Sequence, residues 1–175
     1  MKIKLDDLNI AYKILHPRLA VIIGSGKYNK EVNFMACSWI TPIMENIFGI
    51  AIDKSTYTYQ LIEKYNIFSV NILSFDKKDL IYKLGTTSGK DINKVKEFGL
   101  KVSKGNILEV PILEDSIAFA ECRVINSLDF EEVKFYAGKV ENLEYEDEIF
   151  DKSFGYDLNK IKLPFHVKGK YFRYI

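Results

Sequence analysis

Long apolar runs joined by polar turns fill the first part of the chain. Arg18 to Ser25 is a continuous apolar run, typical of a strand buried on both faces, and a polar turn at 26–31 separates it from Val32 to Trp39. These two runs predict a β-hairpin. Asn9 to Leu15 and Phe48 to Ile52 are shorter apolar segments, and we expect each to form a further strand.

Helical spacing replaces this pattern in the middle of the chain. Apolar side chains recur at helical intervals from Tyr57 to Tyr65, and Ser55 or Thr56 is placed to cap the start of that helix. Two further short helices are predicted over 76–85 and 91–99, because each stretch begins with Asp and ends with Gly.

Strands return on both sides of these short helices. Ile67 to Leu73 predicts one strand, and Ser116 to Asn126 and Val133 to Tyr145 predict two long strands that pair across a turn. Gly138 indicates a bulge or bend in the last of these. Lys170 to Ile175 predicts a final strand. Antiparallel strands with inserted helices favour a mainly β barrel, and the lack of βα alternation and of GxGxxG argues against a doubly wound sheet.

Composition narrows the class of protein. The chain has 175 residues, and we expect a single domain over residues 1–175. Apolar residues make up 47% and charged residues 28%, which is a globular composition. Lys and Arg (25) balance Asp and Glu (24), so the net charge of +1 provides no overall field for nucleic acid or for an anionic membrane.

The sequence also bears on the cellular location of the protein and on metal binding. The longest uninterrupted apolar run, Leu19 to Ile23, is far shorter than the ~20 residues of a membrane span. The first ten residues contain acids and lack the apolar segment of a signal peptide, so we expect a cytoplasmic protein. Cys37 and Cys122 form no CxxC pair and have no neighbouring His. We therefore expect free thiols and no metal site.

The stretch Asn33 to Pro42, NFMACSWITP, is unusual for a core strand. Small side chains at 36–38 would let another molecule approach the backbone, Trp39 supplies a flat face, and Pro42 is expected to end the strand. The alternative is an ordinary hairpin strand whose Trp39 fills the core.

Two groups of polar residues could bind an anion. Residues 53–56 place Lys54 and hydroxyl groups at a helix start, where free N–H groups and the helix dipole favour negative charge. Capping alone would also explain the hydroxyl groups. Lys90 and Lys94 lie near the helix predicted to begin at Asp91, where the dipole disfavours cations. A shared anion would explain them, and two solvated lysines are the alternative.

Seven motifs occur in one order between Pro17 and Tyr174. They are HPRLAVIIGS, NFMACSWITP, KSTYTYQLI, FSVNI, GTTSGKDINKVKEFGL, PILEDSIAFAEC and PFHVKGKYFRY. Each is weak alone, but in this order they are specific. The chain resembles the flavin reductase-like family of FMN-binding split-barrel proteins, which includes flavin reductases, flavoredoxins and related ferric reductases.

The resemblance implies a six-stranded antiparallel Greek-key split barrel that forms a homodimer, with one FMN per subunit near the interface. It also implies the residues that bind FMN: Asn33, Met35, Ala36, Cys37, Ser38 and Trp39 along the flavin and ribityl chain, Asp53, Lys54, Ser55 and Thr58 at the phosphate and ribityl chain, and Ser88, Gly89 and Lys90 in a loop that closes over the cofactor. His166 matches a histidine beside the isoalloxazine and the nicotinamide pocket, and is the candidate catalytic residue.

The implied activity is electron transfer from NAD(P)H through FMN to free flavin, ferric iron or a partner protein, with the hydride carried by the flavin itself. Reductases of this family often have a Gly-Asp-His element where this chain reads SLDFEEVK. Its absence favours the alternative of a flavoredoxin-like FMN electron carrier without its own nicotinamide site. A third alternative is a cofactor-free oligonucleotide-binding barrel, against which the neutral charge and the lack of a basic aromatic stripe argue.

Overall fold

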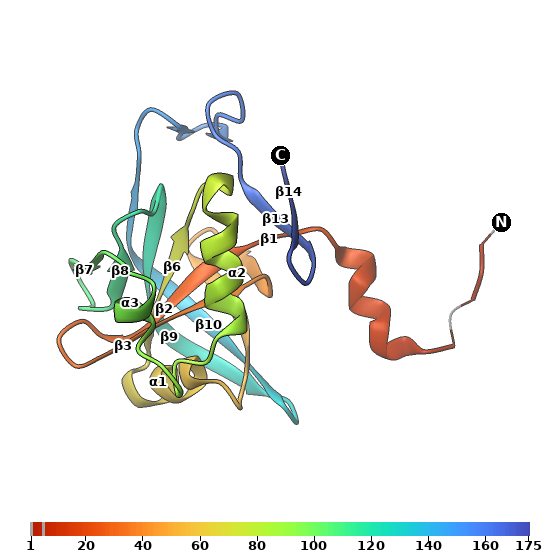
Figure 1. Ribbon diagram of the computed structural model, residues 1–175, viewed down its shortest axis with the longest axis horizontal. Helices are drawn as coiled ribbons and strands as arrows, with labels where there is room; N and C mark the ends of the chain where they lie inside the picture. Colours follow the sequence, from red (N-terminus) through yellow and green to blue (C-terminus); the bar gives the residue numbers. More distant parts are fainter. Residues whose placement is uncertain (1, 5) are drawn as a thin grey trace.

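The computed structural model describes residues 2–4 and 6–175 and is built on one large sheet (Figure 1). Its seven strands are β2 (Val21–Lys27), β3 (Glu31–Cys37), β4 (Ile40–Met44), β5 (Ile47–Asp53), β6 (Ile67–Ile72), β9 (Ala118–Asp129) and β10 (Val133–Tyr145). They lie in the order β3-β2-β6-β9-β10-β5-β4, and every neighbouring pair is antiparallel.

The two edges of this sheet are consecutive in the chain. Only Ser38 and Trp39 separate β3, at one edge, from β4, at the other. The sheet must therefore curl until its edges meet at these two residues, which makes it a barrel. The prediction of a mainly β antiparallel barrel is confirmed, and β4 adds a short strand to the six that the resemblance implied.

Smaller elements surround the barrel. The strands are β1 (Arg18–Leu19), β13 (Pro164–Lys168) and β14 (Tyr171–Tyr174) in one sheet, β7 (Val102–Lys104) with β8 (Pro111–Leu113), and β11 (Phe150–Asp151) with β12 (Gly155–Tyr156). The helices are η1 (Leu8–Leu15), α1 (Tyr57–Tyr65), η2 (Phe75–Lys77), α2 (Lys78–Thr86) and α3 (Lys94–Glu97). None of the helices in the described ranges has the length and apolar character needed to cross a bilayer.

Strand β2 is buried on both faces, as its apolar run predicts. Val21 and Ile23 point into the barrel core, whereas Ile22 packs outward against Ile81 and Leu84 of α2. Side chains of this size contribute about 1.5–3 kcal/mol each when fully buried. This second core holds α2 against the outside of β2 and β3, and so positions the end of α2 beside Ser38.

Helix starts are set by side-chain caps. Thr56 accepts a hydrogen bond from the Tyr59 amide at 3.1 Å, which confirms the predicted start of α1. The helix predicted to begin at Asp91 begins at Lys94 instead. Its N-cap is Asn93, which directly precedes the first turn and accepts from the Lys96 amide at 3.1 Å.

Two other predictions were wrong. Residues 9–15 form part of the 3-10 helix η1, which begins where Asp7 accepts from the Asn9 amide. This helix has no buried residues and extends away from the barrel (Figure 1), so no neighbouring strand is available to make it a strand. Pro42 does not end a strand either. It lies inside β4, an edge strand, where one side of the backbone needs no hydrogen bonds.

The long β9–β10 hairpin bends as expected. The register shifts between Ala137 and Gly138, and a Cβ at Gly138 would lie 2.3 Å from the Phe68 ring. The bend therefore depends on glycine at this position, because any larger residue would displace a fully buried ring.

Candidate functional site

Two hollows meet at Gly85 and Thr86, the last residues of α2, which line both of them. The first, of about 290 Å³, is here called the apolar hollow; its other lining residues are Ala20, Ala36, Cys37, Ser38, Ile81, Tyr82, His166, Gly169 and Phe172. The second, of about 250 Å³, is called the polar hollow; its other lining residues are Asn33, Met35, Ser55, Thr56, Tyr57, Thr58, Thr87, Ser88, Gly89 and Lys94. The two hollows adjoin at these shared residues, both are lined by residues of β3, and together they are called the groove.

Small residues keep α2 close to the floor of this groove. A Cβ built on Gly85 would lie 3.2 Å from the Cβ of Ala36, a tight contact. Larger side chains at either position would push α2 away from β3 or fill the passage between the hollows. The run of small residues that the sequence shows at 36–38 therefore has a structural role at this junction.

Lys94 is the central charge of the polar hollow. Its side chain is buried at 4% exposure, and Nζ donates hydrogen bonds to the carbonyls of Phe34 and Leu84, both at 2.9 Å. None of the ion pairs in the described part of the chain includes Lys94. Burial without a carboxylate partner lowers the pKa of Lys94 to about 8. An ammonium group has a third N–H, which suits an anion in the hollow.

Asn33 is a second buried polar group in the polar hollow. Its Nδ2 donates to Thr58 Oγ1 at 2.8 Å, while its Oδ1 has no hydrogen-bond partner among the described residues. Gly89 lies against this oxygen, since a Cβ on Gly89 would be 2.2 Å from it. A buried acceptor without a donor is costly to leave unpaired, so a hydroxyl-bearing ligand would fit here.

The start of α1 supplies further donors. Residues 55–58 line the polar hollow, and Thr56 occupies the N-cap. The first amides of a helix lack partners within the helix, and the helix dipole adds partial positive charge at this end. With Lys94 nearby, this wall of the groove favours a negatively charged group.

The apolar hollow holds two groups of interest. Burial raises the pKa of the Cys37 thiol to about 11, so the thiol is protonated at neutral pH and is a poor nucleophile. Burial also lowers the pKa of His166, which is therefore neutral at pH 7. His166 Nε2 lies 3.1 Å from the Gly169 carbonyl, and a carbonyl only accepts. The ring proton must be on Nε2, which leaves Nδ1 as an acceptor.

The structure brings ten of the fourteen predicted site residues to the groove. They are Ala36, Cys37, Ser38 and His166 in the apolar hollow and Asn33, Met35, Ser55, Thr58, Ser88 and Gly89 in the polar hollow.

Three predicted residues lie beside the groove without lining it. Trp39 is 52% exposed, and its ring stacks 4.5 Å from the guanidinium carbon of Arg18. It neither fills the core nor faces either hollow. Asp53 accepts from the Ser55 amide at 2.7 Å and so shapes the turn before α1. Lys90 donates to the Ser55 carbonyl and ties the two loops of the polar hollow together.

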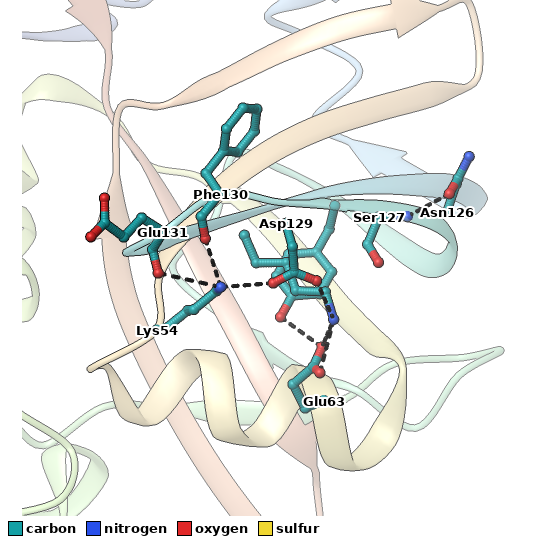
Figure 2. A network of polar contacts seen from close by, with 9 residues as sticks. Lys54, Glu63, Asn126, Ser127, Asp129, Phe130 and Glu131 are labelled. Carbon is teal, nitrogen blue, oxygen red and sulfur yellow. Dashed lines mark hydrogen bonds and ion pairs between the residues drawn. The ribbon is translucent and has the colours of Figure 1, made fainter.

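Lys54 points toward Asp129, Phe130 and Glu131 at the end of the β9–β10 hairpin (Figure 2). Its Nζ donates to the carbonyls of Phe130 and Glu131, at 2.6 and 3.4 Å, and forms an ion pair with Asp129 at 2.7 Å. These partners belong to the turn of the β9–β10 hairpin and its last strand residue. In this structure Lys54 fixes that hairpin to the residues before α1 and does not face the polar hollow.

Lys94 is the most important residue that the predicted site omitted. The sequence shows it in SGKDINK, where its position suggested a shared anion, but nothing local indicates that it is buried. Tyr82 and Thr86 were also missed. Their spacing on α2 is that of any amphipathic helix, and only the packing of α2 against β3 brings them to the groove. Across residues 2–4 and 6–175, no three His, Cys, Asp or Glu side chains gather as metal ligands would.

Relatives of known sequence match most of the chain. An uncharacterized protein of Pyrococcus abyssi is 30% identical over 142 residues, which are 80% of this chain and 81% of the relative. An uncharacterized protein of Archaeoglobus fulgidus is 27% identical over 139 residues, 78% of this chain and 77% of the relative.

Solved structures share the fold over nearly the whole chain. Flavoredoxin from Methanosarcina acetivorans has a TM-score of 0.84 at 23% identity, covering 100% of this chain and 91% of that one. Flavoredoxin of Desulfovibrio vulgaris (Miyazaki F) has a TM-score of 0.85 at 18% identity, covering 100% and 93%. An FMN-binding protein from Thermus thermophilus has a TM-score of 0.83 at 22% identity, covering 99% and 93%. These similarities confirm the split-barrel fold.

A family model also matches the sequence directly. It describes the flavin reductase like domain and covers residues 15–162, which include all lining residues of both hollows except His166, Gly169 and Phe172. The family resemblance of the seven motifs is thereby confirmed. The chain belongs to the flavin reductase-like domain family.

Proposed function

We propose that the groove binds FMN, with the isoalloxazine in the apolar hollow and the ribityl phosphate in the polar hollow. The division of the groove matches the two ends of this cofactor, one flat and mostly apolar and the other hydroxylated and anionic. An FMN-binding protein from Thermus thermophilus has the same fold, which supports the proposal.

The observation that carries the proposal is the buried ammonium of Lys94 in the polar hollow, which donates to two carbonyls but forms no ion pair with any described residue. Burying a charge without a counterion is unfavourable, and a phosphate would provide that counterion. Asn33 Oδ1 fits the same ligand, because a ribityl hydroxyl could donate to this unpaired acceptor. The residues present therefore fit FMN, although Lys54, which was expected to meet the phosphate, is engaged elsewhere.

We propose further that the protein is an oxidoreductase that takes electrons from NAD(P)H and passes them to free flavin, ferric iron or a partner protein. Bound flavin would supply the hydride chemistry, and the chain would supply position and electrostatics. The neutral His166 offers an acceptor at the edge of the apolar hollow, whereas the protonated Cys37 offers only packing. Neither residue has to act as a nucleophile.

One observation favours a flavoredoxin-like electron carrier instead. The turn between β9 and β10 contains no histidine, and its carbonyls are occupied by Lys54. Reductases of the family often place a Gly-Asp-His element near this turn. A chain without it has less support for a nicotinamide site of its own.

Two measurements test the proposal. Titration of the protein into FMN and riboflavin, followed by flavin fluorescence, should show quenching with tighter binding of FMN. A colourless preparation that quenches neither flavin would refute FMN binding and would favour the cofactor-free barrel. Anaerobic mixing of FMN-loaded protein with NADH and NADPH then separates the two electron-transfer functions. Rapid bleaching supports the oxidoreductase, and bleaching only with a reduced partner protein supports the carrier.

We also propose that the protein forms a homodimer. Large apolar side chains are exposed on η1 (Leu8, Ile14 and Leu15) and on β4 (Ile43 and Met44). Tyr12 of η1 lies 5.7 Å from Trp39, which precedes β4, so these two elements adjoin each other. Large exposed apolar side chains on adjoining elements are typical of an interface, and a second copy would cover them. Sedimentation velocity of the FMN-loaded protein tests this; a monomer at high micromolar concentration would contradict it.

A further inference from the structure

Arg18 lies at the rim of the apolar hollow. Its β-bridge partner is His166, which lines that hollow. Its guanidinium carbon is 4.5 Å from the Trp39 ring centroid and 5.9 Å from that of Tyr12. Trp39 directly follows Ser38, another lining residue. The aromatic rings therefore hold the guanidinium next to Ser38 and His166, which line the apolar hollow. The polar hollow adjoins the apolar hollow at other residues, Gly85 and Thr86.

His16 holds the guanidinium without neutralising it. Arg18 Nη2 is 2.9 Å from His16 Nε2, and because a guanidinium only donates, Nε2 must be the acceptor. The other ring nitrogen, Nδ1, contacts the Val167 carbonyl and must donate to it. His16 in this arrangement is a neutral imidazole with its proton on Nδ1. It directs Arg18 but carries no negative charge to balance it.

The positive charge of Arg18 has no counterion in the described part of the chain. None of the ion pairs there includes Arg18, and its buried Nε has no hydrogen-bond partner. The nearby ionisable side chains on β13 and on the segment before β1, His166 and His16, are neutral or cationic. The Nε–H is buried, so an anion from outside the protein would bind at Nη1, which makes no hydrogen bond within the described residues.

We propose that Arg18 binds the pyrophosphate of a dinucleotide hydride donor whose nicotinamide meets the bound flavin at the opening of the apolar hollow. This inference rests on the proposed function. In such a donor the negative charge lies one ribose away from the reacting ring, which would place it at the rim of the hollow rather than inside it. The planar guanidinium presents adjacent donors that match phosphate oxygens. Arg18 is thus a residue for recognition of the second substrate, separate from the Lys94 site for the cofactor phosphate, and His16 is its positioning residue.

The test uses ADP-ribose, which contains the pyrophosphate but lacks nicotinamide. Calorimetric titration of the FMN-loaded protein should show binding of ADP-ribose by the wild type. Arg18→Met, which keeps an unbranched side chain against Trp39, should weaken ADP-ribose and the reducing dinucleotide by about 10- to 100-fold, the range for a lost charge-assisted hydrogen bond. Arg18→Lys, which keeps the positive charge but lacks the adjacent donors of the guanidinium, should give an intermediate loss of affinity for ADP-ribose. The FMN Kd should not change in either variant.

Arg123→Met is the matched control. It removes an equal charge from a surface ion pair with Glu141 on β9 and β10, and it should leave ADP-ribose binding unchanged. Circular dichroism establishes that each variant is folded. Equal ADP-ribose affinity in the wild type and Arg18→Met would overturn the proposal, as would a wild-type protein that binds FMN but neither ADP-ribose nor a dinucleotide. That second outcome would leave the FMN site standing, whereas failure to bind FMN would count against the proposed function itself.

Discussion

The buried ammonium of Lys94 donates to the carbonyl of Leu84 at 2.9 Å, so the first residue of α3 is joined to the last turn of α2. A second bond from the same nitrogen, to Phe34, reaches β3. Lys94 thus connects the three elements that enclose the polar hollow. Because it has no acidic partner in the described residues, its charge is available to a ligand.

Lys94→Met should weaken FMN selectively. Loss of one hydrogen bond from a charged donor to phosphate corresponds to about 1.5–3 kcal/mol, or roughly a 10- to 100-fold higher Kd for FMN. Riboflavin, which has no phosphate, should bind the variant as it binds the wild type. Fluorescence titration with both flavins measures the difference. Equal losses for the two flavins would show that Lys94 does not contact the phosphate.

The pH dependence of FMN binding should follow the Lys94 ammonium. Burial lowers the pKa of Lys94 to about 8, so the wild-type protein should lose affinity for FMN as the pH rises through 8 toward 9, while riboflavin affinity stays level. Lys94→Met should show no such fall. A parallel decline for both flavins would place the titrating group elsewhere.

The same pKa shift predicts the sign of a stability effect. In the unfolded chain Lys94 titrates near the ordinary value of about 10.4, so between about pH 8 and 10.4 the unfolded state binds more protons than the folded state. The contribution of Lys94 to the free energy of unfolding therefore increases with pH across this window. Urea unfolding of wild type and Lys94→Met at about pH 8 and about pH 10 measures this effect. The free energy of unfolding of the wild type, relative to that of Lys94→Met, should be higher at the more alkaline pH.

Lys54→Met should affect the hairpin and not the cofactor. Its Nζ is bonded to Asp129, Phe130 and Glu131 at the end of the β9–β10 hairpin (Figure 2), a partly exposed site where an ion pair contributes at most about 1 kcal/mol. We expect a small decrease in the free energy of unfolding and an unchanged FMN Kd. Selective loss of FMN over riboflavin in this variant would mean that Lys54 turns toward the phosphate when FMN binds.

Ser38→Trp should block the groove without unfolding the barrel. Ser38 lines the apolar hollow at the point where the two sheet edges meet, outside the hydrogen-bonded strands. A bulky ring there would occupy the space assigned to the isoalloxazine. The variant should keep the wild-type circular dichroism spectrum but fail to quench FMN at concentrations that saturate the wild type. Full FMN occupancy would refute this placement of the ring.

Glu121 should be important for stability but not for flavin binding. This fully buried carboxylate accepts from the amides of Asn106, Ile107 and Leu108, with shortest distances of 2.7, 3.0 and 2.7 Å. Glu121→Ala leaves these amides without their acceptor, and we expect a loss of about 3 kcal/mol or more in the free energy of unfolding. Glu141→Ala, which breaks only the surface pair with Arg123, should cost less than about 1 kcal/mol in the same urea titration.

The sequence by itself determined the strands and much of the groove. The strand predicted at Val133 to Tyr145 has the same bounds in the structure, because its alternating pattern reflects a barrel wall with one buried face. Local chemistry limited the cap of α1 to Ser55 or Thr56, and the structure shows that Thr56 is the cap. Ten of the fourteen residues predicted from the small residues at 36–38 and the order of the motifs line the groove, since short side chains stay close to the backbone that carries them.

Only the tertiary structure decided which lysine faces the groove. Lys54 and Lys94 look alike in sequence, since both lie near a helix start with hydroxyl or amide neighbours. Their long side chains follow partners that come from distant segments: Asp129 for Lys54, and Leu84 with Phe34 for Lys94. The strand predicted at residues 9–15 was wrong because it also depended on distant contacts. A short apolar pattern becomes a strand only when a neighbouring strand pairs with it. Local pattern fixes what a segment can form, and long-range contacts fix where a flexible charged group points.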